Sequence, residues 1–153
     1  MGLRREAREH ALQFIYKYDS LESALEERET IAEDLNSFWE NFKPGFSSKG
    51  KEFTSKLIFC IFDNCERIDS FIESHLKNWT IERLSAIDKN ILRIAIAEFL
   101  YFDDIDFNVT INEAIEIAKK FGSEKSSKFI NGVLDKIKGE IGNDKGKKKE
   151  CLM

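Results

Sequence analysis

Apolar residues recur every three or four positions along most of this chain, the spacing that places them on one face of an α-helix. In residues 3–18, LRREAREHALQFIYKY, that face comprises Leu3, Ala7, Ala11, Phe14, Ile15 and Tyr18. The 153 residues contain a single proline, so few of these segments are interrupted. We therefore predict an all-α, single-domain protein of about seven helices, which pack as antiparallel neighbours through short loops.

Breaks in the apolar pattern set the first helix boundaries. Pro44 ends a helix that covers about residues 22–42, and the following stretch, KPGFSSKGK (43–51), is typical of a loop. Residues 52–64 are apolar almost all round, which predicts the central, buried helix of the fold. Another helix is expected over residues 68–79.

Capping patterns predict where two later helices begin. Ser85-x-x-Asp88 and Thr110-x-x-Glu113 both match the capping box, in which a hydroxyl accepts from the backbone three residues on. Gly122 suits the position just past the end of the helix that Thr110 is expected to begin.

The end of the chain divides into a last helix and a tail. Ser123 is expected to cap this helix, and Gly139 is expected to stop it. The helical domain would therefore span residues 1–141. The Lys-rich residues 142–153, GNDKGKKKECLM, are mostly charged residues, glycine and asparagine, so we expect a disordered tail.

The sequence contains no segment that would place the protein in a membrane. Its start, MGLRREAREH, lacks the apolar stretch of a signal peptide, and no apolar run approaches the ~20 residues of a membrane span. We therefore expect a cytoplasmic protein without membrane contact. Cys60 and Cys65 lack a CxxC partner, so they are expected to be buried free thiols.

Motifs for catalysis are absent from the sequence. It has no phosphate-binding loop, no nucleophile elbow, no zinc-protease helix and no Gly-rich dinucleotide turn. His10 and His75 are the only histidines and stand far apart, which gives no support to a metal site or a histidine-based triad. We therefore expect a protein that is not an enzyme and uses no cofactor.

Nucleic-acid recognition finds more support in the sequence. Single-stranded RNA is bound by cations that neutralise phosphates together with rings that stack on bases. The first helix carries Arg4, Arg5 and Arg8 near its start and Tyr16 near its end, and Phe129 is a second candidate ring. The residues alone leave open an alternative, a helical protein-interaction module without specific RNA binding.

Three blocks of the sequence resemble the NusB family of bacterial transcription antitermination factors. They are RREAREHALQFIYKYD, IDSFIESHLKNWTIERLSAIDKNILRIAIAEFLYFDDI and VTINEAIEIAKKFGSEKSSKFINGVLDKI, in the order in which the family has them. The resemblance implies a fold of two small helical bundles without catalysis. It also implies binding of the boxA element of ribosomal RNA leader transcripts, as single-stranded RNA. The implied protein partners are NusE, a small-subunit ribosomal protein, and an RNA polymerase elongation complex with other Nus factors.

The resemblance also implies which residues contact RNA. Matched by motif position, they are Arg4, Arg5, Arg8, Tyr16, Asp88, Ser126, Lys128, Phe129 and Asn131. The NusE surface is expected around the fourth and fifth helices. One departure from the family pattern is Glu6, which subtracts charge from the arginine run, so we expect weak RNA affinity without NusE. Another is the loop DDIDFN, which lacks a proline that the family often has there.

Overall fold

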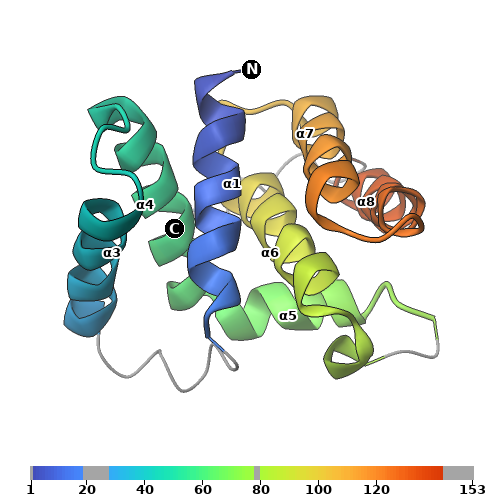
Figure 1. Cartoon of the computed structure of the whole chain (residues 1–153). Helices are drawn as coiled ribbons and strands as arrows, with labels where there is room; N and C mark the ends of the chain where they lie inside the picture. Colours follow the sequence, from blue (N-terminus) through green and yellow to red (C-terminus); the bar gives the residue numbers. More distant parts are fainter. Residues whose placement is uncertain (1, 19–27, 78–79, 143–153) are drawn as a thin grey trace. The chain divides into compact units, whose positions relative to one another are not determined.

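The computed structural model describes residues 2–18, 28–77 and 80–142. Within those ranges the backbone forms seven α-helices, one 3-10 helix and no strand, which confirms the predicted all-α class (Figure 1). The elements are α1 (Leu3–Tyr16), α3 (Arg28–Phe42), α4 (Ser48–Asp63), α5 (Cys65–Glu73), η1 (Ile81–Arg83), α6 (Ala86–Tyr101), α7 (Phe107–Phe121) and α8 (Ser126–Gly142). The chain divides into two compact units, Met1–Cys65 and Glu66–Met153. None of the helices in these ranges combines the length and apolar character that a membrane span needs.

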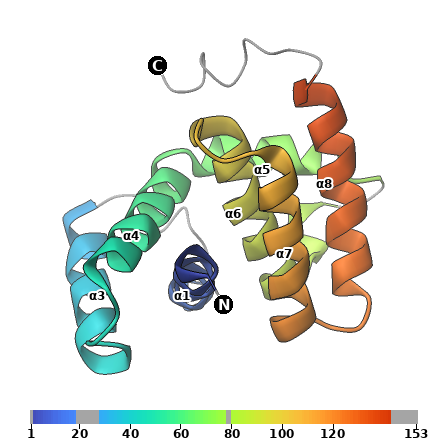
Figure 2. The same ribbon diagram turned by 90° about the horizontal axis from the view of Figure 1, so that it is seen from above.

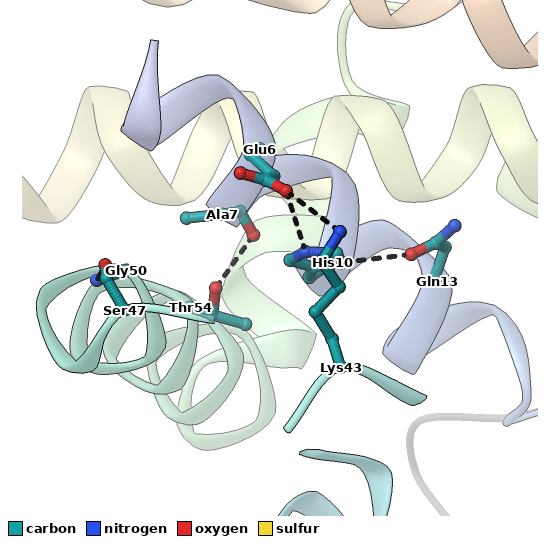
Figure 3. Close-up of polar contacts among 8 residues, drawn as sticks. All are labelled: Glu6, Ala7, His10, Gln13, Lys43, Ser47, Gly50 and Thr54. Carbon is teal, nitrogen blue, oxygen red and sulfur yellow. Dashed lines mark hydrogen bonds and ion pairs between the residues drawn. The ribbon is translucent and has the colours of Figure 1, made fainter. Parts of the chain in front are cut away.

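In the first unit, α1 packs along α4 (Figure 1). Most of the predicted apolar face of α1 is buried, with Ala7, Ala11 and Phe14 each 0% exposed, but Leu3 at its start is 43% exposed. Because alanine side chains are small, the two helices approach closely enough for a direct bond between them. The Thr54 hydroxyl on α4 donates to the Ala7 carbonyl at 2.9 Å (Figure 3). Both groups are buried, so this bond fixes α1 at one position along α4.

An aromatic cluster attaches α3 and the loop after it to α1. The His10 imidazole lies edge-on to four rings, at centroid distances from 4.7 to 6.4 Å; these rings belong to Phe38, Trp39, Phe42 and Phe46. Edge-to-face contacts of this kind are favoured because the positive edge of one ring meets the negative face of another. Trp39 and Phe46 form the buried part of this cluster, at 7% and 8% exposed, whereas Phe42 is 51% exposed at its edge.

The first unit departs from the predicted boundaries at the start of α4. Ser48 already lies in the helix, because the Ser47 side chain caps it by accepting from the Gly50 backbone N–H at 3.0 Å. The loop is therefore shorter than the predicted 43–51. The predicted helix over residues 22–42 is confirmed from residue 28 onward, and its first part lies outside the described residues.

Residues 52–63 are helical as predicted, as part of α4, but the prediction that this helix is buried almost all round is wrong. On α4, the exposed side chains of Glu52, Lys56 and Asp63 line up within about 40° of one another at 100° per residue, so one side of this helix is polar. The helix with the most continuous burial is α6 of the second unit, whose residues from 90 to 100 are all buried. Within the second unit α7 and α8 both pack against it and against each other (Figure 2).

Two polar contacts, one partly buried and one buried, join helices of the second unit. Arg93 on α6 donates to both carboxylate oxygens of Asp69 on α5, at 2.7 and 2.8 Å. The Glu98 carboxylate, 1% exposed on α6, accepts from the Thr110 hydroxyl of α7 at 2.8 Å. Such charge-assisted bonds offset the cost of burying an ionised group.

Of the two capping boxes predicted in the second unit, one is found at the start of a helix and the other is not. Ser85 caps α6 as predicted, and its side chain accepts from the Asp88 backbone N–H at 3.1 Å. The prediction that Thr110 caps α7 is wrong, because Asp106 holds that position and accepts from the Asn108 backbone N–H at 2.8 Å. Thr110 lies inside α7, and its hydroxyl donates to Glu98 instead.

Several predicted helix ends also require correction. The helix predicted over residues 68–79 starts at Cys65 and ends at Glu73, and Trp79 lies outside the described residues. The last helix starts at Ser126 rather than directly after Ser123. It continues through Gly139 to Gly142, so this glycine does not stop it.

The free cysteines are confirmed only in part as buried. Cys65 is 3% exposed, whereas Cys60 is half-buried, and neither forms a disulfide. Cys151 lies outside the described residues, as does the predicted tail from residue 143 onward.

Candidate functional site

Two of the three arginines near the start of α1 are positioned by one aromatic ring. The guanidinium carbons of Arg4 and Arg8 lie 4.8 and 5.3 Å from the centroid of the Phe53 ring on α4. Attraction between a guanidinium and the face of a ring is strongest where water is partly excluded. Arg4 is exposed, Arg5 is half-buried and Arg8 is only 3% exposed. The edge of α1 therefore presents Arg4 and Arg5 to solvent and holds Arg8 against the protein.

Glu6 is engaged on another side of α1. Its Oε1 lies 3.4 Å from the Lys43 Nζ and 3.8 Å from the His10 Nε2 (Figure 3). The His10 Nδ1 in turn lies 3.2 Å from the Gln13 Oε1. Because Lys43 contributes a positive charge beside Glu6, this acid subtracts less from the arginine edge than its place in the sequence suggests.

Tyr16 is the last residue of α1 and is 53% exposed, which leaves much of its ring accessible. Tyr18, two residues on, has a different role. Its hydroxyl donates to the Asp34 carboxylate at 2.6 Å, and burial together with this carboxylate raises the pKa of the Tyr18 phenol. Tyr18 therefore joins the end of α1 to α3, and Tyr16 is the ring that faces solvent.

Asp88 lies in the first turn of α6. Its backbone N–H bonds to the Ser85 cap, and its side chain is half-buried. Among the described residues, no group bonds to its buried Oδ1. A carboxylate oxygen at the positive end of a helix is stabilised by the helix dipole and remains a strong acceptor.

The candidate residues at the start of α8 differ widely in exposure. Ser126 is 2% exposed, and its Oγ accepts from the Ser123 backbone N–H at 3.0 Å, so this hydroxyl organises the first turn of the helix. Lys128 and Asn131 are exposed and three residues apart, which makes them neighbours on one side of α8. Phe129 is half-buried, as expected for a ring shared between core and surface.

Gly122 explains how the connection before α8 is so tight. A Cβ at this position would lie 2.5 Å from the Ser126 Oγ and 2.8 Å from the Ala118 carbonyl oxygen. Glycine is therefore required by close approach, and its φ of −94° is one that any residue adopts.

The nine predicted RNA contacts divide between the two units. Arg4, Arg5, Arg8 and Tyr16 share α1 of the first unit, and the other five lie on α6 and α8 of the second unit. Their roles in RNA binding stay predictions. No cluster of three or more potential metal ligands occurs in the described ranges.

Sequence reasoning missed a cavity between α1 and α4. Its volume is about 300 Å³, and its lining comprises Leu3, Arg4, Lys49, Gly50, Glu52, Phe53 and Lys56. Lys49 was assigned to a loop, although the spacing of Lys49, Phe53 and Lys56 is that of one helix face. Once α4 is known to start at Ser48, that spacing identifies all three as neighbours.

Comparisons with known proteins agree with the fold and with the sequence motifs. Residues 5–138 match the sequence profile of the NusB family. The transcription antitermination protein NusB of Thermodesulfovibrio yellowstonii is 42% identical over 149 residues, which cover 95% of this chain and 99% of that protein. The corresponding protein of Bacillus mycoides is 44% identical over 138 residues, covering 90% and 98% of the two chains.

Solved structures give the same result. A crystal structure of T. maritima NusB has a TM-score of 0.75 and 38% identity, and the match covers 90% of this chain and 91% of that one. A structure described as antitermination factors NusB and NusE in complex with dsRNA has a TM-score of 0.70 and 30% identity, covering 90% and 97%.

Proposed function

The chain belongs to the NusB family, whose curated relatives are transcription antitermination proteins, and on that premise we propose that it binds single-stranded boxA RNA together with NusE. In this proposal the complex joins an RNA polymerase elongation complex with other Nus factors in the cytoplasm and opposes premature termination. The protein acts by binding and not by catalysis. The NusB relative described in complex with NusE and dsRNA supports NusE and RNA as partners.

The observation that carries the proposal is the arginine edge of α1. Arg4 and Arg5 are accessible at one end of the helix. The buried Arg8 adds a positive charge one turn further on, where its guanidinium group lies over the Phe53 ring. Arginine forms paired hydrogen bonds with phosphate oxygens, and its planar group also stacks on bases. The exposed Tyr16 ring offers a stacking surface near the other end of the same helix.

The second unit contributes the remaining contacts in this proposal. Lys128 neutralises phosphate, Asn131 bonds to base edges and Phe129 stacks through its exposed part. The Asp88 carboxylate accepts from base amino groups or sugar hydroxyls. Ser126 contributes chiefly by setting the first turn of α8, because its hydroxyl already accepts from the Ser123 backbone.

The proposal is tested by titrating labelled boxA RNA and a scrambled RNA of equal length with the protein, with and without NusE, at several salt concentrations. We expect tighter binding of boxA than of the scrambled RNA, with the difference largest when NusE is present. Equal binding of both RNAs under all conditions would overturn the proposal and leave a protein-interaction module without specific RNA binding.

A double variant and a control variant test whether the arginine edge of α1 is part of the RNA-binding site. Arg4→Gln with Arg5→Gln is expected to reduce the slope of log K against log salt by about 0.7 for each phosphate that the protein no longer neutralises. Arg8 is left intact because it is 3% exposed against Phe53, so its replacement would disturb the packing of α1 as well as the RNA surface. Lys136→Gln, which removes an exposed charge from the later part of α8, is the control and is expected to leave the slope unchanged.

A further inference from the structure

We propose that the cavity between α1 and α4 binds one nucleotide of the single-stranded RNA, with Lys49 and Lys56 as phosphate contacts. This inference rests on the proposed function and extends its RNA surface from α1 onto α4. Neither lysine belongs to the set of RNA contacts predicted from the sequence.

The first argument is the chemistry of the cavity lining. Three cations, Arg4, Lys49 and Lys56, and one acid, Glu52, line it, so the formal charge of the lining is 3 − 1 = +2. Leu3 and Phe53 add apolar surface to the same cavity. A nucleotide presents a negative phosphate and an apolar aromatic base within one residue, which matches both parts of this lining.

The second argument is size and accessibility. The volume of about 300 Å³ lies at the lower end of the range for small-molecule pockets, which suits one nucleotide and not a folded protein segment. Lys49 and Lys56 are exposed, so their ammonium groups reach solvent at the cavity, and Leu3 is 43% exposed although it is apolar. Covering Leu3 with a base would remove apolar surface from water.

The third argument is that the cavity is built by rigid parts. Lys49, Phe53 and Lys56 lie on one face of α4, and the Thr54–Ala7 bond fixes α1 at one position along that helix. Phe53 also contacts the Arg4 and Arg8 guanidinium groups. The cavity therefore adjoins the arginine edge directly, and a strand that crosses Arg4 would meet Lys49 or Lys56 without a break in positive charge.

The test uses the full chain with NusE and boxA RNA. In the variant Lys49→Gln, Lys56→Gln, both cations are replaced by a residue with similar helix propensity, so the fold is expected to be retained. Because two phosphates would no longer be neutralised, the slope of log K against log salt should become shallower by about 1.4. Between 50 and 200 mM salt, the factor by which RNA affinity drops should therefore be about seven times smaller for the variant than for the wild type. The matched control is Lys51→Gln on the same helix. Its Nζ donates to the Pro44 carbonyl and lies 5.7 Å from the Trp39 ring, away from the cavity.

A second readout does not depend on variants. Acylation of lysines in the wild-type protein, with and without RNA and followed by mass spectrometry, should show protection of Lys49 and Lys56 by RNA and none of Lys51. An unchanged salt slope in the double variant, with no protection of these lysines, would overturn the inference. Loss of NusE binding by the double variant with RNA binding retained would also overturn it, since the cavity would then serve a protein surface.

Failure of this inference is distinguishable from failure of the proposed function. If the wild type discriminates boxA from scrambled RNA and the lysine variant has the same salt slope as the wild type, the cavity is excluded as an RNA site and the proposed function stands. If the wild type shows no discrimination, the proposed function itself fails, and the cavity loses its ligand with it.

Discussion

Two glycines in helices are expected to respond in opposite directions to the same substitution. Gly132 lies in the interior of α8, and a Cβ there would meet no atom within 4 Å. Gly132→Ala should therefore stabilise the protein by up to about 1 kcal/mol, the difference in helix propensity between the two residues. Gly50 lies near the start of α4, where a Cβ would fall 2.3 and 2.5 Å from two ring carbons of Phe46.

The Phe46 ring has little freedom to move away from an alanine at position 50. It is 8% exposed, stacks on Trp39 at a centroid distance of 5.7 Å and meets His10 at 4.7 Å. Overpacking of this kind typically costs about 1–3 kcal/mol. After subtracting a helix-propensity gain of at most about 1 kcal/mol, we expect Gly50→Ala to destabilise the protein by about 1 kcal/mol.

Urea unfolding followed by far-ultraviolet circular dichroism measures both changes. With a slope of about 2 kcal/mol per molar urea, the two midpoints should move apart by about 1 M, with Gly50→Ala below the wild type and Gly132→Ala above it. If Gly50→Ala were as stabilising as Gly132→Ala, the Phe46 ring would have to be free to move, and the packing argument for the aromatic cluster would be refuted.

Three further substitutions or treatments test buried polar groups. Burial raises the pKa of the Cys60 thiol from 9.0 to about 12, so its alkylation by iodoacetamide at pH 8 should be about a thousandfold slower in the folded protein than in urea, as followed by mass spectrometry. Because the folded-state pKa is the higher one, this thiol contributes stability that is complete below pH 9 and is lost as the pH rises towards 12. Thr110→Val removes a donor from the buried Glu98 carboxylate and should lower the free energy of unfolding by about 2 kcal/mol in a urea titration, whereas an unchanged value would mean that this bond contributes nothing. Asp69→Asn leaves the Arg93 guanidinium without its paired charge and should cost about 2 kcal/mol in the same assay; a stabilised variant would contradict the inferred role of this ion pair.

Local signals in the sequence predicted much of the fold. The apolar spacing of α1 correctly identified Ala7, Ala11 and Phe14 as buried, because helical periodicity alone decides which residues share a face. The Ser85 cap was predictable for the same reason, since a cap and its partner lie within one turn.

Long-range contacts account for what the sequence did not reveal. Thr110 has the same local pattern as Ser85, but its hydroxyl bonds to Glu98 on α6, which no neighbouring residue indicates. Glu6 was counted against the arginines because its nearness to Lys43, 37 residues away by number, is not visible in the sequence. Burial of Arg8 likewise depends on Phe53 in another helix.

For the candidate site, the sequence indicated residue types better than their surroundings. The arginine run and Tyr16 are local features, and the structure leaves Arg4, Arg5 and Tyr16 accessible. The cavity that Arg4 lines forms only when α1 and α4 meet, so its lysines could be recognised only from the packed helices.

The central claim is that this chain binds boxA RNA specifically as a partner of NusE. The most direct test is the titration of boxA and scrambled RNA in the presence of NusE at several salt concentrations. The predicted result is tighter binding of boxA, with a salt slope that decreases when Arg4 and Arg5 are replaced by glutamine. Equal affinity for the two RNAs, or a slope that these substitutions leave unchanged, would contradict the account.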